Sequence, residues 1–176
     1  MKNNLDIEDI YEQHADNVYH YILFLVRNKE IAEDLTQETF IRVFQNYGKF
    51  NHMAKLNTWI LQIAKNITYD YFRAQKWRSF TQYFPWQQSE VSPSSEEQVL
   101  KKIELDLLYT SLQTLKIDYQ QVIILRKING SSINETAIIL GWSENKVKTK
   151  LARALKKLNV EMEKRKEEHY GETRQV

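Results

Sequence analysis

The sequence contains no cysteine, which excludes disulfide scaffolds, thiolate zinc sites, iron–sulfur clusters and cysteine nucleophiles. Glycine and proline are also scarce, with 4 and 2 residues in a chain of 176. Because β-sandwiches and barrels need many turn residues, this shortage favours long helices. The chain also lacks an apolar run that could span a bilayer, and it does not start like a signal peptide. We therefore expect a cytoplasmic protein that does not insert into a membrane.

The charged residues are strongly segregated, although the net charge is only +2. Residues 1–40 hold nine acidic and three basic side chains, whereas residues 41–80 hold one acidic and seven basic. Residues 81–99 hold three acidic side chains and no basic one, and residues 100–160 hold eleven basic and five acidic. Two basic blocks indicate two places that hold a polyanion, and the acidic start indicates a partner other than nucleic acid.

The hydrophobic pattern predicts helices on either side of a linker. Both prolines, a serine cluster and a lack of basic residues predict a flexible linker over 79–98. Apolar residues recur at helical spacing on both sides, which predicts helices over 7–26, 31–47, 56–75, 99–115, 119–128, 133–140 and 144–166.

We therefore predict an all-α protein made of two small helical domains. The first domain covers residues 1–78, the second covers 99–160, and residues 161–176 form a charged C-terminal tail. Domains of this size bury only about 60% of their unfolded surface, so each is expected to lean on a partner.

The second domain has the spacing of a helix-turn-helix. Ala137 allows the two helices to approach, Gly141 tolerates the turn, and Ser143 is placed to cap the second helix. Apolar residues at steps of four and three are predicted to face inward: Val147, Leu151, Ala154 and Leu158. The candidate DNA contacts lie at the tip and outer face of this helix: Ser143, Glu144, Asn145, Lys146, Lys148, Thr149 and Arg153. The alternative is a helical hairpin with a solvated basic face.

A second basic surface is predicted on the helix over 56–75. Its inward residues are expected to be Ile60, Ile63, Ile67 and Tyr71, with Trp59 also in the core. The opposite side is basic and polar, with aromatic residues nearby, and it carries Lys65, Asn66, Tyr69, Asp70, Arg73 and Lys76. Such a row suits single-stranded or melted DNA, because cations follow phosphates and rings stack on bases. A solvated basic face is the alternative.

The helix over 31–47 carries an unusual outward stripe made of Asp34, Gln37, Glu38 and Ile41. Two carboxylates at like-charge spacing beside an exposed apolar residue are more typical of a protein-docking surface than of a DNA face. A solvated acidic helix is one alternative, and a carboxylate metal or acid/base site is another. The four histidines have no ligand spacing, and the chain lacks a glycine-rich phosphate loop and a Ser/His pairing. We predict no enzyme activity, no catalytic residue, no metal, no cofactor and no small-molecule substrate.

Together these segments resemble the extracytoplasmic-function (group IV) sigma factors of bacterial RNA polymerase, in the sigma-70 superfamily. AEDLTQETFIRVF and TWILQIAKNITYDYFR are similar to sigma domain 2, and the segment from LQTLKIDYQQ to LARALKKL is similar to sigma domain 4. The chain departs from the family pattern at Leu115-Lys116, where the family commonly has Leu-Pro, and at Asn145-Lys146, where it has Gly-Thr.

The resemblance implies a specificity subunit that directs transcription initiation. The stripe Asp34, Gln37, Glu38 and Ile41 would dock on core RNA polymerase. The loop over 49–57, with Asn57, and the row from Lys65 to Lys76 would capture and melt the −10 element. The second helix of domain 4 would read the −35 element in promoter DNA. It further implies inhibition by an anti-sigma factor, which is often membrane-bound and would then hold the protein at the inner face of the membrane.

Two other functions remain open. A helix-turn-helix regulator whose N-terminal domain senses a ligand or dimerises would bind duplex operator DNA unaided. A helical hydrolase that uses Asp34 and Glu38 would require a metal ion.

Overall fold

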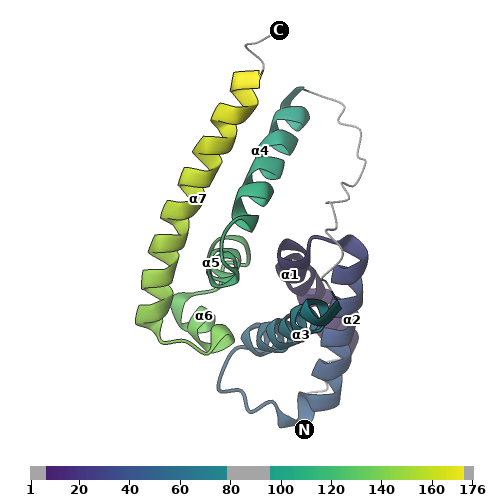
Figure 1. Ribbon diagram of the computed structural model, residues 1–176. Helices are drawn as coiled ribbons and strands as arrows, with labels where there is room; N and C mark the ends of the chain where they lie inside the picture. Colours follow the sequence, from purple (N-terminus) through teal and green to yellow (C-terminus); the bar gives the residue numbers. More distant parts are fainter. Residues whose placement is uncertain (1–6, 79–95, 173–176) are drawn as a thin grey trace. The chain divides into compact units, whose positions relative to one another are not determined.

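The computed structural model describes residues 7–78 and 96–172, with side chains described for residues 7–75 and 104–168 (Figure 1). All regular elements within these ranges are helical, which confirms the predicted all-α class. Most of the predicted linker over 79–98 lies outside the described residues. No helix in the described part of the chain is both long and apolar enough to cross a membrane.

The helices begin and end close to the positions that the hydrophobic pattern predicts. In chain order the elements are α1 (Ile7–Val26), α2 (Lys29–Asn46), η1 (Tyr47–Lys49), α3 (Leu56–Arg78), α4 (Glu96–Gln113), α5 (Ile117–Ile123), the π-helical turn η2 (Ile124–Ile128), α6 (Ile133–Leu140) and α7 (Glu144–Glu172). The largest difference is at the end of the chain. There α7 continues to Glu172, well into the segment predicted as a charged tail.

The chain divides into two compact units. The first comprises Met1–Gln87 and Ile124–Glu144, so η2 and α6 belong with α1, α2 and α3. The second comprises Gln88–Ile123 and Asn145–Val176, and it contains α4, α5 and α7.

The core of the first unit lies where α1, α2 and α3 pack together. Its most buried side chains come from all three helices: Val18, Tyr21, Ile22, Phe40, Val43, Ile60, Leu61 and Ala64. The predicted core positions Ile60 and Ile67 of α3 are confirmed. Three other expected core residues, Ile63, Tyr71 and Trp59, are only half-buried. Trp59 packs instead near the loop before α3, with its ring 5.1 Å from that of Phe50.

In the second unit, α7 presents its predicted apolar side inward. Val147, Ala154 and Leu158 are buried, and Leu151 is half-buried. Leu112, Leu115 and Val122 of the segment from α4 to α5 are also buried. Because these four α7 residues recur at steps of four and three, they share one side of the helix and leave its charged side in solvent.

Both ends of α6 are set by local sequence. Ser132 accepts a hydrogen bond from the Glu135 backbone N–H at 3.1 Å, and the Ser132 backbone N–H donates to the Glu135 carboxylate at 2.6 Å. This reciprocal capping box satisfies two N–H groups that would otherwise lack partners. Gly141 ends α6 in the left-handed conformation with φ of 67°, as the predicted turn requires.

Candidate nucleic-acid and protein interfaces

The predicted acidic stripe lies on the outside of α2. Asp34, Gln37 and Ile41 are exposed, and Ile41 leaves 55% of its surface in solvent. The other side of α2 is buried against the core through Ala32, Leu35, Thr36, Thr39, Phe40 and Val43. The exposed Ile41 and its two neighbouring carboxylates are thus on the outside of α2, as the prediction of a protein-docking surface requires. We call Asp34, Gln37, Glu38 and Ile41 the acidic stripe.

A polar hollow lies along the outer side of α3. It is lined by Arg42, Lys65, Asn66, Tyr69, Asp70, Arg73 and Leu140, which we call the α3 hollow. The structure thus brings together five of the residues predicted for melted DNA. Partial burial lowers the pKa of Lys65 because desolvation disfavours its charged form. Nη2 of Arg73 lies 3.6 Å from Oδ1 of Asp70, one turn earlier on α3. A carboxylate on the same surface therefore positions the Arg73 guanidinium.

Arg42 is a lining residue that the sequence analysis missed. Its guanidinium comes from α2, and it also pairs with Glu38 at 2.5 Å. Arg42 belongs to the basic block over 41–80, and this is the one feature of the sequence that could have indicated a role in nucleic-acid binding. Periodicity within α2 does not reveal that Arg42 reaches a hollow formed by another helix.

Asn57 does not line this hollow. Its side-chain oxygen accepts a hydrogen bond from Asn17 Nδ2 of α1 at 3.0 Å. Asn57 also bonds to His14, whose pKa is lowered because burial outweighs that hydrogen bond. The first turn of α3 is therefore tied to α1. The side chain of Lys76, the last predicted member of the row, lies outside the described residues.

The first turns of α7 present the predicted reading residues to solvent. Every predicted contact residue is exposed: Ser143, Glu144, Asn145, Lys146, Lys148, Thr149 and Arg153. Glu144 also accepts a hydrogen bond from Asn134 Nδ2 at 3.2 Å, across the turn that Gly141 opens. Exposure of these side chains is what contact with a major groove would require.

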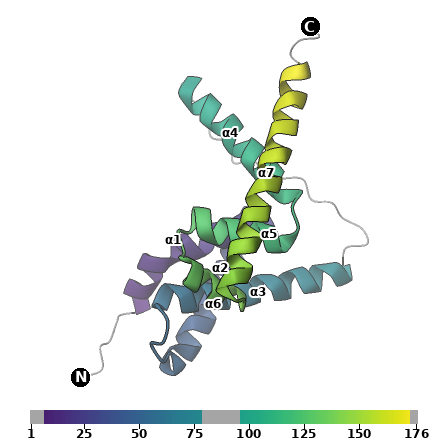
Figure 2. The same cartoon turned by 90° about the vertical axis from the view of Figure 1, so that its left-hand side faces the viewer.

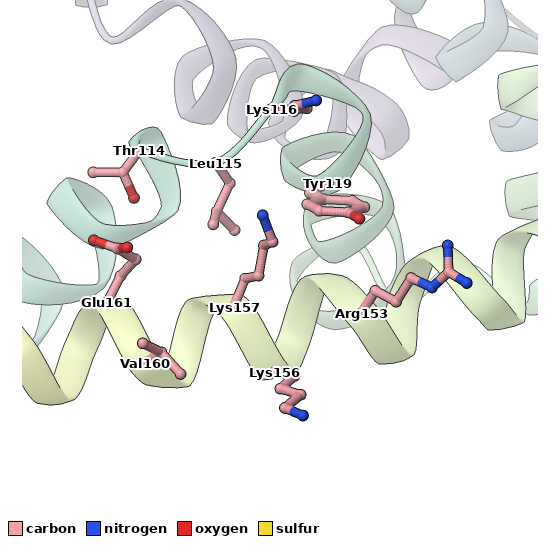
Figure 3. Close-up of a pocket in the computed structure, with 9 residues that line it drawn as sticks. All are labelled: Thr114, Leu115, Lys116, Tyr119, Arg153, Lys156, Lys157, Val160 and Glu161. Atoms are coloured by element: carbon pink, nitrogen blue, oxygen red, sulfur yellow. The ribbon is translucent and has the colours of Figure 1, made fainter.

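Two lysines of α7 have partners inside the second unit. Lys150 Nζ lies 3.0 Å from Asp118 Oδ2 and 5.3 Å from the centre of the Tyr119 ring. Lys157 Nζ lies 5.8 Å from the centre of the same ring. Figure 3 shows Lys157 reaching from α7 toward Leu115 and Tyr119, whereas Lys156 points away. These cation–π and ionic contacts fix the start of α5 against α7.

The same region forms a groove between α7 and the segment that joins α4 to α5. Its lining combines four basic residues, Lys116, Arg153, Lys156 and Lys157, with Leu115, Tyr119 and Val160 (Figure 3). The acidic side chain in the lining is Glu161. The described residues contain no cluster of three histidine or carboxylate side chains that would hold a metal ion.

Two solved structures share this fold. RpoE of Bartonella quintana, solved in complex with the anti-sigma factor NepR, matches with a TM-score of 0.72 at 20% identity. That match covers 89% of this chain and 96% of RpoE. CnrH, solved in complex with the cytosolic domain of CnrY, matches with a TM-score of 0.68 at 20% identity, over 90% of this chain and 88% of CnrH.

Sequence comparisons agree with the two basic blocks and their order. Residues 10–78 match the family model for sigma-70 region 2, and residues 105–158 match that for sigma-70 region 4. The ECF RNA polymerase sigma factor SigX of Bacillus subtilis is 35% identical over 90% of this chain and 84% of its own length. The RNA polymerase sigma factor YlaC of the same species is 32% identical over 96% of this chain and 98% of its own length. A helical chain that carries both sigma regions over nearly its whole length belongs to the extracytoplasmic-function sigma factors of the sigma-70 family.

Proposed function

We propose that the chain binds core RNA polymerase and directs initiation at promoters with a −10 and a −35 element, without catalysis of its own. The observation that carries this proposal is the presence of two surfaces of different chemistry on the first unit. An acidic stripe with exposed Ile41 lies on α2, and a basic, aromatic hollow lies along α3. A DNA-binding protein that acts alone needs the second surface and not the first.

The acidic stripe would be the polymerase-docking surface. The carboxylates of Asp34 and Glu38 would orient the approaching partner by their charge. The exposed Ile41 beside them provides apolar surface that the partner would bury. The expected partner surface is therefore basic at its edge and apolar at its centre.

The α3 hollow would hold the melted strand of the −10 element. Lys65 and Arg73 would follow phosphates, and the Tyr69 ring would stack on an unpaired base, since stacking needs a base outside the duplex. Asn66 and Asp70, which are exposed beside them, would contact base edges. The pairing of Asn57 with Asn17 gives Asn57 the additional task of holding the loop before α3 against α1.

The start of α7 would read the −35 element in duplex DNA. Lys148 and Thr149 lie on the exposed side of the first turns and would reach base edges, while Arg153 lies one turn further and would contact phosphate. Lys150 serves a different purpose, because it is paired with Asp118.

Inhibition by an anti-sigma factor in the cytoplasm or at the membrane surface is part of the proposal. It is supported by the anti-sigma complexes of the fold relative RpoE and by the exposed stripe on α2, which an inhibitor would cover in place of polymerase.

Run-off transcription from a pool of linear genomic fragments tests the proposed function. Core RNA polymerase alone, this protein alone and the two combined are compared on the same pool. We expect defined transcripts only from the combination. Absence of transcripts together with tight duplex binding by the protein alone would favour a helix-turn-helix regulator instead.

A further inference from the structure

A cation from α2 lines the α3 hollow. Helix α3 lies against α2 in the first unit (Figure 2). Arg42 of α2 forms part of the same lining as Lys65 and Arg73 of α3. The lining therefore holds three cations from two helices and one carboxylate, Asp70. Lys65 and Arg73 are the cations that the proposed function assigns to phosphates of the −10 strand, which leaves the role of Arg42 open.

The Arg42 guanidinium is held by a carboxylate of its own helix. Its Nη2 lies 2.5 Å from Oε1 of Glu38, one turn earlier on α2. Among the side chains described for residues 7–75 and 104–168, Glu38 is the one polar partner of the Arg42 side chain. A guanidinium presents five N–H donors in a planar fork that fits carboxylate and phosphate alike. Glu38 and a DNA phosphate would therefore compete for the same cation.

The pair between Arg42 and Glu38 is weak enough for a phosphate to replace the carboxylate. Each of the two side chains is 44% exposed. An exposed ion pair at this helical spacing shifts an equilibrium by about twofold. A strand that is bound by Lys65 and Arg73 presents its next phosphates to Arg42 at a high effective concentration. Bonds from arginine to phosphate are charge-assisted, so they replace the bond to Glu38 with one of equal kind.

We infer that Arg42 is a third phosphate contact of the −10 strand and that Glu38 is its competitor in the free chain. The inference rests on the proposed function and adds to it a contact from α2. Glu38 has two tasks in this arrangement, because it also belongs to the acidic stripe. A partner that binds the Glu38 carboxylate would then strengthen the hold on the strand.

A second ion pair on α2 provides a matched control. Lys29 Nζ lies 3.8 Å from Oε1 of Glu33, with the same spacing of four residues. Both side chains are exposed, and neither lines the α3 hollow. Substitution of Lys29 or Glu33 changes the charge of α2 as much as substitution of Arg42 or Glu38. The control pair therefore reports what charge alone does to DNA binding.

Binding of a fluorescein-labelled oligothymidylate to the free full-length protein tests the competition, since a phosphate contact does not depend on base sequence. Anisotropy at low salt is measured for Glu38→Gln, Arg42→Gln, their double variant, and the controls Glu33→Gln and Lys29→Gln. We expect Arg42→Gln to bind about three- to tenfold more weakly than the parent and to reduce the slope of log affinity against log salt by about 0.7. Glu38→Gln should bind about two- to threefold more tightly, and this gain should vanish in the double variant.

The double variant separates competition from simple repulsion. If Glu38→Gln tightens binding equally with and without Arg42, the carboxylate acts by repelling DNA, and the competition is overturned. The inference is also overturned if Glu38→Gln gives no gain over the parent, or if Lys29→Gln weakens binding as much as Arg42→Gln does. Circular dichroism of each variant checks that helicity is kept.

The same variants in complex with core RNA polymerase separate this inference from the proposed function. Arg42→Gln should weaken oligonucleotide binding by the complex, whereas Lys29→Gln should not. If Glu38 and Arg42 are coupled in the free protein while polymerase produces no transcripts, the phosphate contact stands and the proposed function is removed. Defined transcripts together with no effect of Arg42→Gln would leave the proposed function standing and remove the contact.

Discussion

The carboxylate of Glu38 lies 2.5 Å from the guanidinium of Arg42, one turn further along α2. Glu38 belongs to the acidic stripe, and Arg42 lines the α3 hollow. This ion pair therefore joins the surface proposed for polymerase to the surface proposed for melted DNA. Docking that attracts Glu38 away from Arg42 would free a cation for the DNA strand.

Charge reversal on the acidic stripe is expected to weaken polymerase binding strongly. Asp34→Lys combined with Glu38→Lys places two cations where the partner needs carboxylates, and we expect at least about tenfold weaker binding. Fluorescence anisotropy with core polymerase measures the affinity, and circular dichroism checks that helicity is kept. Glu33→Lys on the same helix is the control, because Glu33 is exposed but lies outside the stripe. Unchanged binding of the double variant would remove the docking assignment.

Loss of the Tyr69 ring is expected to weaken binding to unpaired −10 DNA. Stacking on an aromatic ring is worth about 1–3 kcal/mol per base, so Tyr69→Ala in the polymerase complex should bind a single-stranded −10 oligonucleotide roughly fivefold to 150-fold more weakly. Tyr69→Phe keeps the ring and should bind as the parent does. If the phenylalanine variant binds as poorly as the alanine variant, the hydroxyl rather than stacking is responsible.

Lys148 and Lys150 lie two residues apart on α7, and their substitution should have different effects. Lys148→Ala should weaken binding to −35 duplex DNA and relax its base preference, because Lys148 lies on the exposed reading side. Lys150→Ala should lower the stability of the protein, since Lys150 is paired with Asp118. Binding to a panel of mutated duplexes and urea unfolding separate the two effects. If Lys148→Ala lowers the affinity equally for every duplex sequence, Lys148 contacts phosphate instead of a base. The slope of log affinity against log salt concentration should then be smaller by about one.

Gly141→Ala is expected to destabilise the turn of the helix-turn-helix. Gly141 has φ of 67°, and an added Cβ would meet no atom within 4 Å, so the cost arises from backbone conformation alone. The left-handed conformation costs an L residue about 1–2 kcal/mol. The free energy of unfolding, measured by urea denaturation, should therefore fall by that amount. Gly48→Ala is the control, because Gly48 has equal space and no positive φ. Equal destabilisation of both variants would show that the turn is not the cause.

Much of the local structure is readable from the chain. Helix boundaries follow from apolar spacing, and Gly141 follows from its place between two periodic segments. The capping box of α6 can also be recognised in the sequence, as Ser132 followed three residues later by Glu135. These features depend on residues within a turn of one another, so composition and spacing are enough to predict them.

Other features depend on which helices meet. Sequence alone determined an all-α chain with two basic blocks, an acidic stripe and a helix-turn-helix. The tertiary structure decided that Arg42 joins the α3 hollow, that Lys150 is held by Asp118 across 32 residues, and that Asn17 meets Asn129 across 112. The spacing of apolar residues predicts which side of a helix is buried. It does not predict which polar side chains of distant segments come within hydrogen-bonding distance. That is decided by packing, because the core sets the separation and rotation of the helices from which those side chains extend.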